Sequence, residues 1–316
     1  MKKALVLGAS GGMGSAIVRE LVSRGTQVRA FARNRDKLES MFGTLDEVEI
    51  YSGDLFNEES LSQAAEGVEI IYHAANIPYQ DWATKLPTLM NNILGTAKKH
   101  RAKLAIVDNI YAYGRSYGTL ITEQHPKDPH TKKGKLRLNV EQLAKESGVS
   151  MFIAHFPDFY GPDADNTLLH FLFKSIVENK KAMFVGKQDI AREYIFTPDG
   201  AKAIVDLSLQ DDTYGANWNV PGYGVITGAE IVKIARETTG YEKKVSTVTK
   251  NMIRMLGLFN SGMREYVEMF YLNEEPVILS GEKYEQKFGK WPRTSYEEGI
   301  KLTLEHLANR RDNTKS

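Results

Sequence analysis

Residues 3–23 have the sequence KALVLGASGGMGSAIVRELVS, and this stretch decides the fold. Four apolar residues at 4–7 form a short strand-like run, and the glycines Gly8, Gly11 and Gly14 follow it at intervals of three. A helical pattern of apolar residues starts directly after the last glycine. A strand that turns through glycines into a helix is typical of a βαβ unit, so the stretch predicts a parallel sheet that contains this strand.

The glycine turn also predicts a ligand. A backbone without Cβ atoms can approach a pyrophosphate closely, and the N-terminus of the next helix offers free N–H groups to the phosphate charge. We therefore expect a dinucleotide to bind over the turn, where it would contact Gly8, Ser10, Gly11, Gly12, Met13 and Gly14.

Strand-like and helix-like segments alternate through the first half of the chain. The strand-like runs are 4–7, 27–32, 48–51, 70–73, 104–107 and 151–155, and the helix-like stretches lie near 12–24, 34–42, 57–66, 80–100 and 133–147. This alternation predicts an α/β fold, a Rossmann-type doubly wound parallel sheet.

The second half has a different texture. Turn-forming residues crowd the segment after 156, residues 217–220 resemble one more strand, and 225–308 are rich in helical patterns. We predict two parts: a Rossmann domain over 1–160, with sheet contributions from about 190–222, and a smaller α-rich C-terminal substrate lobe formed by 161–189 and 223–316.

Composition excludes several classes of protein. The formal net charge of +1 argues against a nucleic-acid partner, and the absence of cysteine excludes disulfides and thiolate metal sites. No H-x-H or H-E-x-x-H spacing occurs, so no metal site is expected. No run approaches the roughly 20 apolar residues of a membrane span. We expect a cytoplasmic protein with a small-molecule substrate and no membrane partner, and a homodimer is left open.

The end of the second strand bears on the choice of dinucleotide. NAD-specific folds usually place a carboxylate there to bind the ribose hydroxyls, but this strand is followed by Arg33 and no acid. A guanidinium can pair with the 2′-phosphate of NADP. The sequence therefore favours NADP as the cofactor, with NAD as the alternative, and Arg33 as the residue that selects it.

The longer glycine spacing and four later segments resemble the short-chain dehydrogenase/reductase superfamily, in its extended and atypical branch of NAD-dependent epimerases and dehydratases. The resemblance covers at least residues 1–222. It implies an adenine contact at Asp54 and Leu55, a ribose contact at Ala74, Ala75 and Asn76, a Tyr-Gly pair at Tyr113 and Gly114, and a nicotinamide contact at Phe156 and Pro157.

The catalytic pattern of that superfamily, Ser or Thr followed by Tyr-x-x-x-Lys, is incomplete here. Asn109 stands at the serine position. If Glu141 keeps the usual glutamate spacing, Arg137 replaces the lysine and Lys133 the tyrosine; otherwise Lys135 is the lysine and a threonine replaces the tyrosine. We favour the first alignment, and in neither is the tyrosine present.

Another group must then supply the proton that the tyrosine normally exchanges. We predict Tyr111, with Arg137 or Lys135 lowering its pKa, and Asn109 as a hydrogen-bond donor to the substrate oxygen. Tyr113 is expected to be packing. The histidines His73, His155 and His170 rank second because two of them end strands.

Residues 252–271 are rich in methionine and aromatic residues. Core packing between helices is the favoured interpretation, and an apolar substrate pocket is the alternative. Taken together, the residues predict an NAD(P)-dependent oxidoreductase that acts on a small carbonyl or alcohol. The alternatives are a nucleotide-sugar epimerase or dehydratase and a non-catalytic redox sensor that binds NADP.

Overall fold

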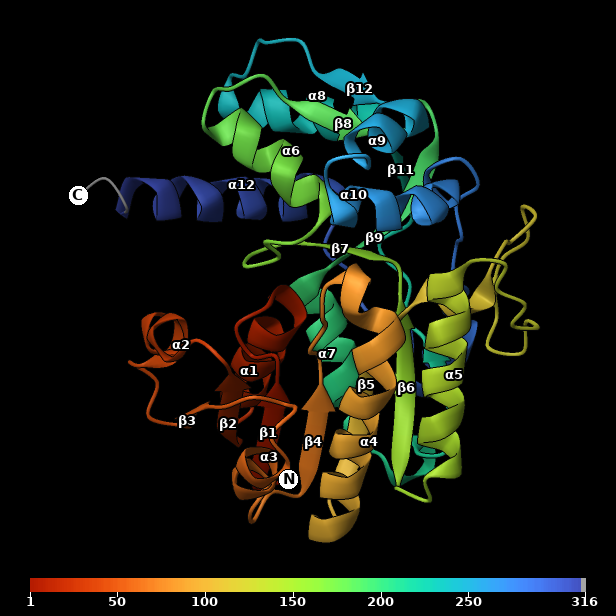
Figure 1. The fold of residues 1–316 in the computed structure, drawn as a ribbon. Coiled ribbons are helices and arrows are strands. Elements are labelled where there is room, and N and C mark those ends of the chain that lie inside the picture. Colours follow the sequence, from red (N-terminus) through yellow and green to blue (C-terminus); the bar gives the residue numbers. More distant parts are fainter. Residues whose placement is uncertain (314–316) are drawn as a thin grey trace.

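The computed structural model describes residues 1–313. At its centre lies a seven-stranded sheet in the order β10-β6-β5-β4-β1-β2-β3, and every neighbouring pair is parallel (Figure 1). The strands are β1 (Lys3–Leu7), β2 (Gln27–Ala32), β3 (Val48–Ser52), β4 (Ile70–His73), β5 (Lys103–Asn109), β6 (Met151–Phe156) and β10 (Asn217–Asn219). The predicted doubly wound parallel sheet is confirmed.

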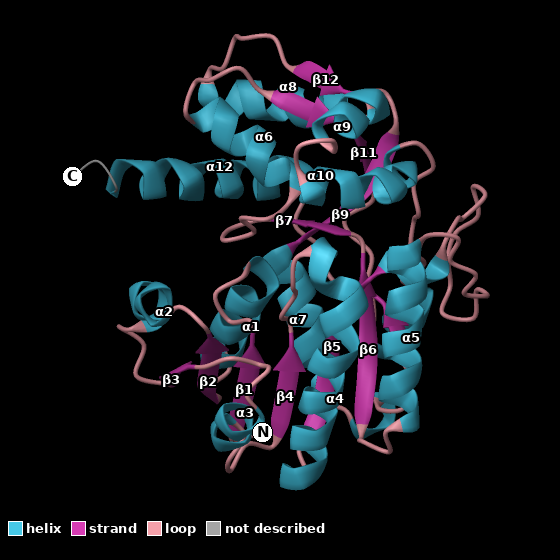
Figure 2. Ribbon diagram, viewed as in Figure 1, coloured by secondary structure: helices cyan, strands magenta, loops and turns pink. Residues whose placement is uncertain are grey.

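Helices cover both faces of this sheet (Figure 2). One apolar core joins the sheet to α3 (Glu58–Ala64), α4 (Trp82–His100) and α5 (Lys132–Glu146). The other core joins it to α1 (Gly12–Ser23), α2 (Arg35–Phe42) and α7 (Thr197–Ser208). Because both faces are buried, the strands are apolar runs without alternation, which is why the sequence pattern located them well.

Side chains cap most of these helices in the way the sequence suggests. Asn34 caps α2, Asn57 caps α3 and Thr131 caps α5, each by accepting a hydrogen bond from a backbone N–H of the first turn. In the C-terminal part, Thr227 and Glu230 form a complete capping box at α8 (Gly228–Thr239). These local contacts explain why the helices begin where the sequence predicts.

A second group of elements lies above the carboxyl ends of the strands (Figure 1). It contains a three-stranded sheet of β7 (Asp158–Tyr160), β9 (Ala191–Phe196) and β11 (Val225–Thr227), and the pair β8 (Met183–Val185) and β12 (Ser246–Val248). Its core packs against α6 (Leu168–Val177), α8 and α12 (Tyr296–Asn313). Of the segment 190–222, β10 joins the central sheet and β9 does not.

The remaining elements are the 3₁₀ helices η1 (Tyr79–Asp81), η2 (Ile110–Tyr113), η3 (Asp211–Thr213) and η4 (Val267–Asn273), and the helices α9 (Lys250–Leu256), α10 (Ser261–Tyr266) and α11 (Glu282–Phe288). Met269, Tyr271 and Trp291 pack into the two cores of the central sheet. The division into a Rossmann domain and a substrate lobe stays a prediction, and these residues show that the two parts share core. Within residues 1–313 no helix has the length and apolar character to cross a membrane.

Candidate cofactor and reaction site

The glycine turn between β1 and α1 is closely packed on two sides. Gly8 has a positive φ of 80°, and a Cβ there would lie 2.6 Å from the Cα of Ala75 in the neighbouring β4 connection. A Cβ at Gly14 would lie 2.9 Å from the Cα of Ala9. These two glycines therefore let strand, turn and helix approach one another.

Gly11 is different, because a Cβ there would meet only the carbonyl oxygen of Gly8, at 3.5 Å. Its open side lies beside the N-terminus of α1, which no side chain caps, in contrast to α2, α3 and α5. An uncapped N-terminus beside open backbone fits a bound pyrophosphate. The side chain of Met13 is buried against Gly200 of α7, so Met13 can meet a phosphate only through its backbone.

The cations after β2 are not equivalent. Arg35 pairs with Glu39 at 2.9 Å, and Lys37 pairs with Asp165 at 3.2 Å. Arg33 is exposed and forms no ion pair with any residue from 1 to 313. Of the three side chains it is the one available to an incoming phosphate.

The segments that the resemblance assigns to the cofactor lie along the carboxyl edge of the sheet. Asp54 is exposed and its carboxylate accepts a hydrogen bond from the N–H of Phe56, while Leu55 is half-buried. After β4, Ala74 is half-buried and Asn76 is exposed. After β6, Phe156 and Pro157 are buried, so they can offer a cofactor little more than backbone.

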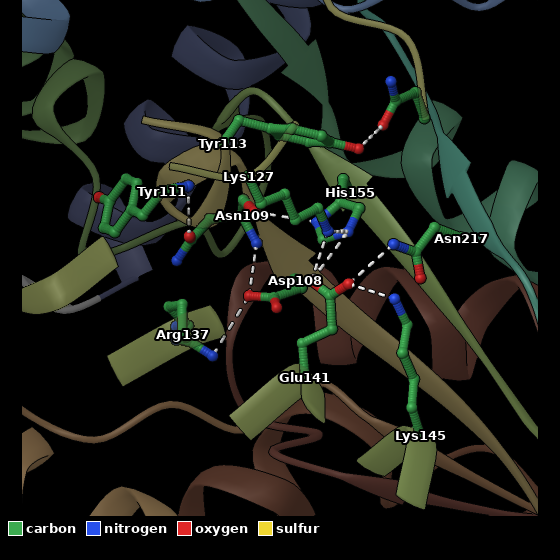
Figure 3. Close-up of polar contacts among 11 residues, drawn as sticks. Asp108, Asn109, Tyr111, Tyr113, Lys127, Arg137, Glu141, Lys145, His155 and Asn217 are labelled. Carbon is green, nitrogen blue, oxygen red and sulfur yellow. Dashed lines mark hydrogen bonds and ion pairs between the residues drawn. The ribbon is translucent and has the colours of Figure 1, made fainter. Parts of the chain in front are cut away.

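The candidate catalytic residues lie at the carboxyl end of β5. The Oδ1 atom of Asn109 caps η2 by accepting a hydrogen bond from the N–H of Tyr111 at 3.0 Å, which leaves the amide NH₂ as a donor (Figure 3). The buried Arg137 lies 3.4 Å from Asp108, donates to Oδ1 of Asn76 at 3.2 Å and stacks over the ring of Trp82. Arg137 thus connects the ends of β4 and β5.

Helix α5 distinguishes the two sequence alignments. Lys133 and Arg137, one helical turn apart, are both buried on its inner face. Lys135 is exposed on the outer face, and Thr131, which the second alignment would place at the tyrosine position, caps the helix through its hydroxyl. The structure does not bring Lys135 to the other candidate residues, so the second alignment loses its support.

Lys133, which the first alignment places at the position of the missing tyrosine, is already paired. Its Nζ atom forms ion pairs with Glu265 of α10 and with Glu268 of η4, the latter at 3.3 Å. The ammonium is buried, and both carboxylates come from a segment more than 130 residues away in the sequence. Through these two ion pairs Lys133 links the C-terminal part of the chain to α5.

The hydroxyls of Tyr111 and Tyr79 lie 2.6 Å apart and are hydrogen-bonded. Burial raises the pKa of Tyr111 well above 10, and Tyr79 and Asp158 act in the same direction. Burial also raises the pKa of Tyr79, to about 12. The expectation that Arg137 lowers the pKa of Tyr111 is wrong, because burial dominates and Arg137 pairs with Asp108 instead.

Behind Asn109 lies a buried charged network that sequence analysis missed. Lys127 contacts both Glu141 and the Nε2 atom of His155, and the Nδ1 atom of His155 lies 3.1 Å from the carbonyl oxygen of Asn109 (Figure 3). Because an ammonium can only donate, Nε2 accepts and Nδ1–H donates to that carbonyl. The network therefore holds the backbone of Asn109 in place.

The pKa values of His155 and Glu141 are both lowered, for different reasons. Burial and the neighbouring Lys127 lower the pKa of His155 to about 4. Burial alone would raise the pKa of Glu141, but His155 and Lys127 lower it to about 2. At neutral pH the ammonium of Lys127 therefore lies between the neutral imidazole of His155 and the carboxylate of Glu141. Sequence reasoning found Glu141 through helix spacing, but Lys127 lies in a loop without any pattern.

The remaining candidates lie elsewhere or serve packing. Tyr113 is buried and its hydroxyl donates to Oδ1 of Asn219, so its predicted packing role is confirmed. Burial lowers the pKa of His73 to about 3, which makes it a poor acid at neutral pH. His170 lies on α6, 3.7 Å from Asp165.

A comparison with known protein families supports the dinucleotide site that the glycine turn predicts. The family model described as NAD(P)H-binding matches residues 8–167, about half of the chain. The chain belongs to the NAD(P)H-binding family. Its predicted cofactor class is thereby confirmed as NAD(P), without a distinction between the two dinucleotides.

Two curated relatives of this NAD(P)H-binding protein match over short stretches. Sterol demethylase protein B of Methylococcus capsulatus is 44% identical over 71 residues, which are 22% of this chain and 21% of the relative. The 2-alkyl-3-oxoalkanoate reductase of Shewanella oneidensis is 33% identical over 111 residues, 35% of this chain and 27% of the relative. The matches therefore span much less than two thirds of either relative.

Solved structures match over the whole chain. The UDP-glucuronic acid 4-epimerase of Bacillus cereus, in complex with NAD, superposes with a TM-score of 0.81 over 98% of this chain and 99% of its own, at 17% identity. At that identity the likeness shows the fold. The predicted resemblance to the epimerase/dehydratase branch is confirmed at this level.

Proposed function

We propose that the protein is an NADP(H)-dependent reductase of a carbonyl group on a small, largely apolar substrate. The cofactor would lie over the glycine turn, with its pyrophosphate at the N-terminus of α1 beside Gly11 and its 2′-phosphate at Arg33. Bound NADPH supplies the hydride. The preference for NADP rests on Arg33, which has no ion-pair partner among residues 1–313 while Arg35 and Lys37 do.

The observation that carries the proposal is the hydrogen-bonded phenol pair of Tyr111 and Tyr79 beside Asn109. In the proposed reaction the amide of Asn109 donates a hydrogen bond to the substrate oxygen, and the phenol of Tyr111 gives that oxygen its proton. Tyr79 can then pass a proton to Tyr111 along their shared hydrogen bond. Lys133 would have no part in proton transfer because two carboxylates hold its ammonium.

The protonation state of Tyr111 fits the start of a reduction. A phenol whose pKa lies well above 10 is protonated at neutral pH, so Tyr111 carries the proton that the oxygen of a carbonyl substrate would accept. The proposed direction is from carbonyl to alcohol.

Two of the relatives and the charges of the site support an apolar substrate, while other relatives are UDP-glucose 4-epimerases. One of the two is named for the reduction of an oxoalkanoate and the other for sterol demethylation. Glu265 and Glu268 bring two carboxylates to the one ammonium of Lys133, which leaves an excess of one negative charge among these three groups. This excess would disfavour a nucleoside diphosphate beside them.

The proposal is tested by incubating the purified protein with NADPH and a panel of 3-oxoalkanoates, sterol ketones and UDP-sugars. We expect NADPH to be oxidised in the presence of at least one apolar ketone. Conversion of a UDP-sugar without net consumption of cofactor would favour the epimerase alternative. Tight NADPH binding without turnover on the whole panel would contradict the reductase and favour a sensor.

A further inference from the structure

Helices α9 and α10 form a short hairpin whose tip is apolar and exposed. Six large apolar side chains between residues 252 and 263 are exposed: Met252, Met255, Leu256, Leu258, Phe259 and Met263. Phe259 is 94% exposed and Leu258 75%. The ten other exposed large apolar residues of the described chain are spread from residue 1 to 302. The expectation of core packing is therefore wrong for these six residues.

The inner face of the hairpin shows that it is folded and not merely loose. Ile253 of α9 is buried in a small core with Val248 and Phe270, and Tyr266 of α10 packs against the same core. Thr249 caps α9 and Asn260 caps α10. The hairpin thus presents its apolar tip to solvent. Single exposed apolar residues are ordinary in proteins, but a group of them marks an interaction surface.

Two arginines accompany the tip. Arg254 of α9 and Arg264 of α10 are exposed, and neither forms an ion pair with a described residue; Arg254 only donates to Asn251. The nearest acid in sequence, Glu265, is bound to Lys133. The hairpin therefore presents apolar side chains together with uncompensated positive charge.

We propose that this hairpin docks the protein on an anionic lipid surface, with Leu258 and Phe259 inserted among the acyl chains and Arg254 and Arg264 at the headgroups. Apolar residues flanked by arginines are the composition of an interfacial anchor. A stable protein interface usually takes about 800 Å² and roughly 20–30 residues from each side, whereas this tip presents six large apolar side chains. The anchor revises the expectation that the protein has no membrane partner.

The hairpin is also attached to the candidate site. Helix α10 packs on η1, which carries Tyr79, and its Glu265 pairs with Lys133. Six helical residues span only about 9 Å, so the lipid surface would lie close to the outer wall of the site. Docking does not depend on the proposed reaction, and it can be measured without a substrate.

The test is flotation of the full chain with phosphatidylcholine vesicles, with and without phosphatidylserine. We expect binding to the phosphatidylserine vesicles, and loss of at least about tenfold in the double variant Leu258→Asp/Phe259→Asp. In Arg254→Gln/Arg264→Gln the preference for phosphatidylserine should fall, by roughly fivefold for each charge removed. Added salt should weaken the wild-type protein and affect this variant less.

The matched control is Tyr117→Asp, which changes another exposed aromatic residue, 83% exposed and far from the hairpin in sequence. This control should bind as the wild type does, and all variants should keep the wild-type NADPH affinity and melting temperature. Failure of the wild-type protein to bind either vesicle would overturn the proposal. So would unchanged binding by the Leu258 and Phe259 variant, or a dimer that this variant dissociates while vesicle binding persists.

Discussion

The two halves of the candidate site are built in different ways. At the glycine turn, backbone makes the site: Gly8 and Gly14 allow close packing, and Gly11 leaves open backbone at an uncapped helix. At the end of β5, side chains make the site, and buried charges hold Asn109 and Arg137.

A site made of backbone depends on a few glycines at fixed spacing, and this chain keeps them. A site made of side chains can change one residue at a time, and Lys133, at the tyrosine position in the first alignment, binds Glu265 and Glu268 instead. Hence the glycine turn identifies the family, while the reaction depends on how the side chains at the end of β5 are arranged.

The largest effect is expected for Gly11→Val. A side chain at Gly11 has room in the protein, since its Cβ meets only the Gly8 carbonyl oxygen at 3.5 Å, but it would fill the space of the pyrophosphate. Losing two charge-assisted contacts costs about 3–6 kcal/mol, so NADPH affinity should fall by roughly 10²–10⁴-fold in a fluorescence titration.

The matched control is Gly95→Val on α4, where a Cβ meets nothing within 4 Å. It should keep the wild-type affinity. Equal affinity in the Gly11 and Gly95 variants would show that the cofactor does not lie over the turn.

In the reaction half, Tyr111→Phe should lower kcat by about 10²–10⁴-fold, the usual cost of removing a positioned acid, and leave NADPH affinity nearly unchanged. Tyr79→Phe should lower kcat less, because it removes only the group that resupplies the proton. Steady-state kinetics on a ketone found by the screen would measure both.

Tyr113→Phe is the control, because its hydroxyl bonds to Asn219 away from the phenol pair. It should cost about 1 kcal/mol of stability and little activity. Full activity in Tyr111→Phe would transfer the proton donor to another group or to water.

The next effect concerns the choice of cofactor. Arg33→Ala should weaken NADPH by roughly ten- to a hundredfold and NADH hardly at all, since one charge-assisted contact is worth about 1.5–3 kcal/mol. Arg35→Ala removes a cation that already pairs with Glu39 and should change neither affinity. Equal losses for both cofactors in the Arg33 variant would contradict its assignment to the 2′-phosphate.

The smallest effect is a fall in the free energy of unfolding in acid, caused by the protonation of His155 behind Asn109. The pKa of His155 is about 4 in the folded protein and 6.5 ordinarily, so the unfolded chain binds its proton first as the pH falls. Stability from this residue is present above pH 6.5, and about 1.5 kcal/mol of it should be lost between about pH 6.5 and 5.

Denaturant titrations of the wild type and of His155→Gln over that pH range would measure the contribution of His155 to the free energy of unfolding. The variant should be less stable at neutral pH and less sensitive to acid, with His73 contributing equally to both. Parallel curves would show that His155 does not titrate as its burial implies.

Most of the fold could be predicted from residues alone. The strands β2 and β4 have the predicted bounds, and the helix starts at Asn57 and Thr227 follow from capping side chains. These features depend on contacts between near neighbours or on the burial of whole strands, and both leave a pattern in the sequence. The glycine turn and its dinucleotide belong to the same class.

Tertiary structure alone decided the rest. The choice between Lys133 and Lys135 needed the orientation of α5, the bond between Tyr79 and Tyr111 joins two separate connections, and Lys133 meets its carboxylates across more than 130 residues. The pKa of Tyr111 rises instead of falling because burial depends on everything packed around it. The residues at 252–263 have the composition of a core, and only the fold leaves them facing outward. Such contacts arise from distant segments that meet on folding, so no local pattern encodes them.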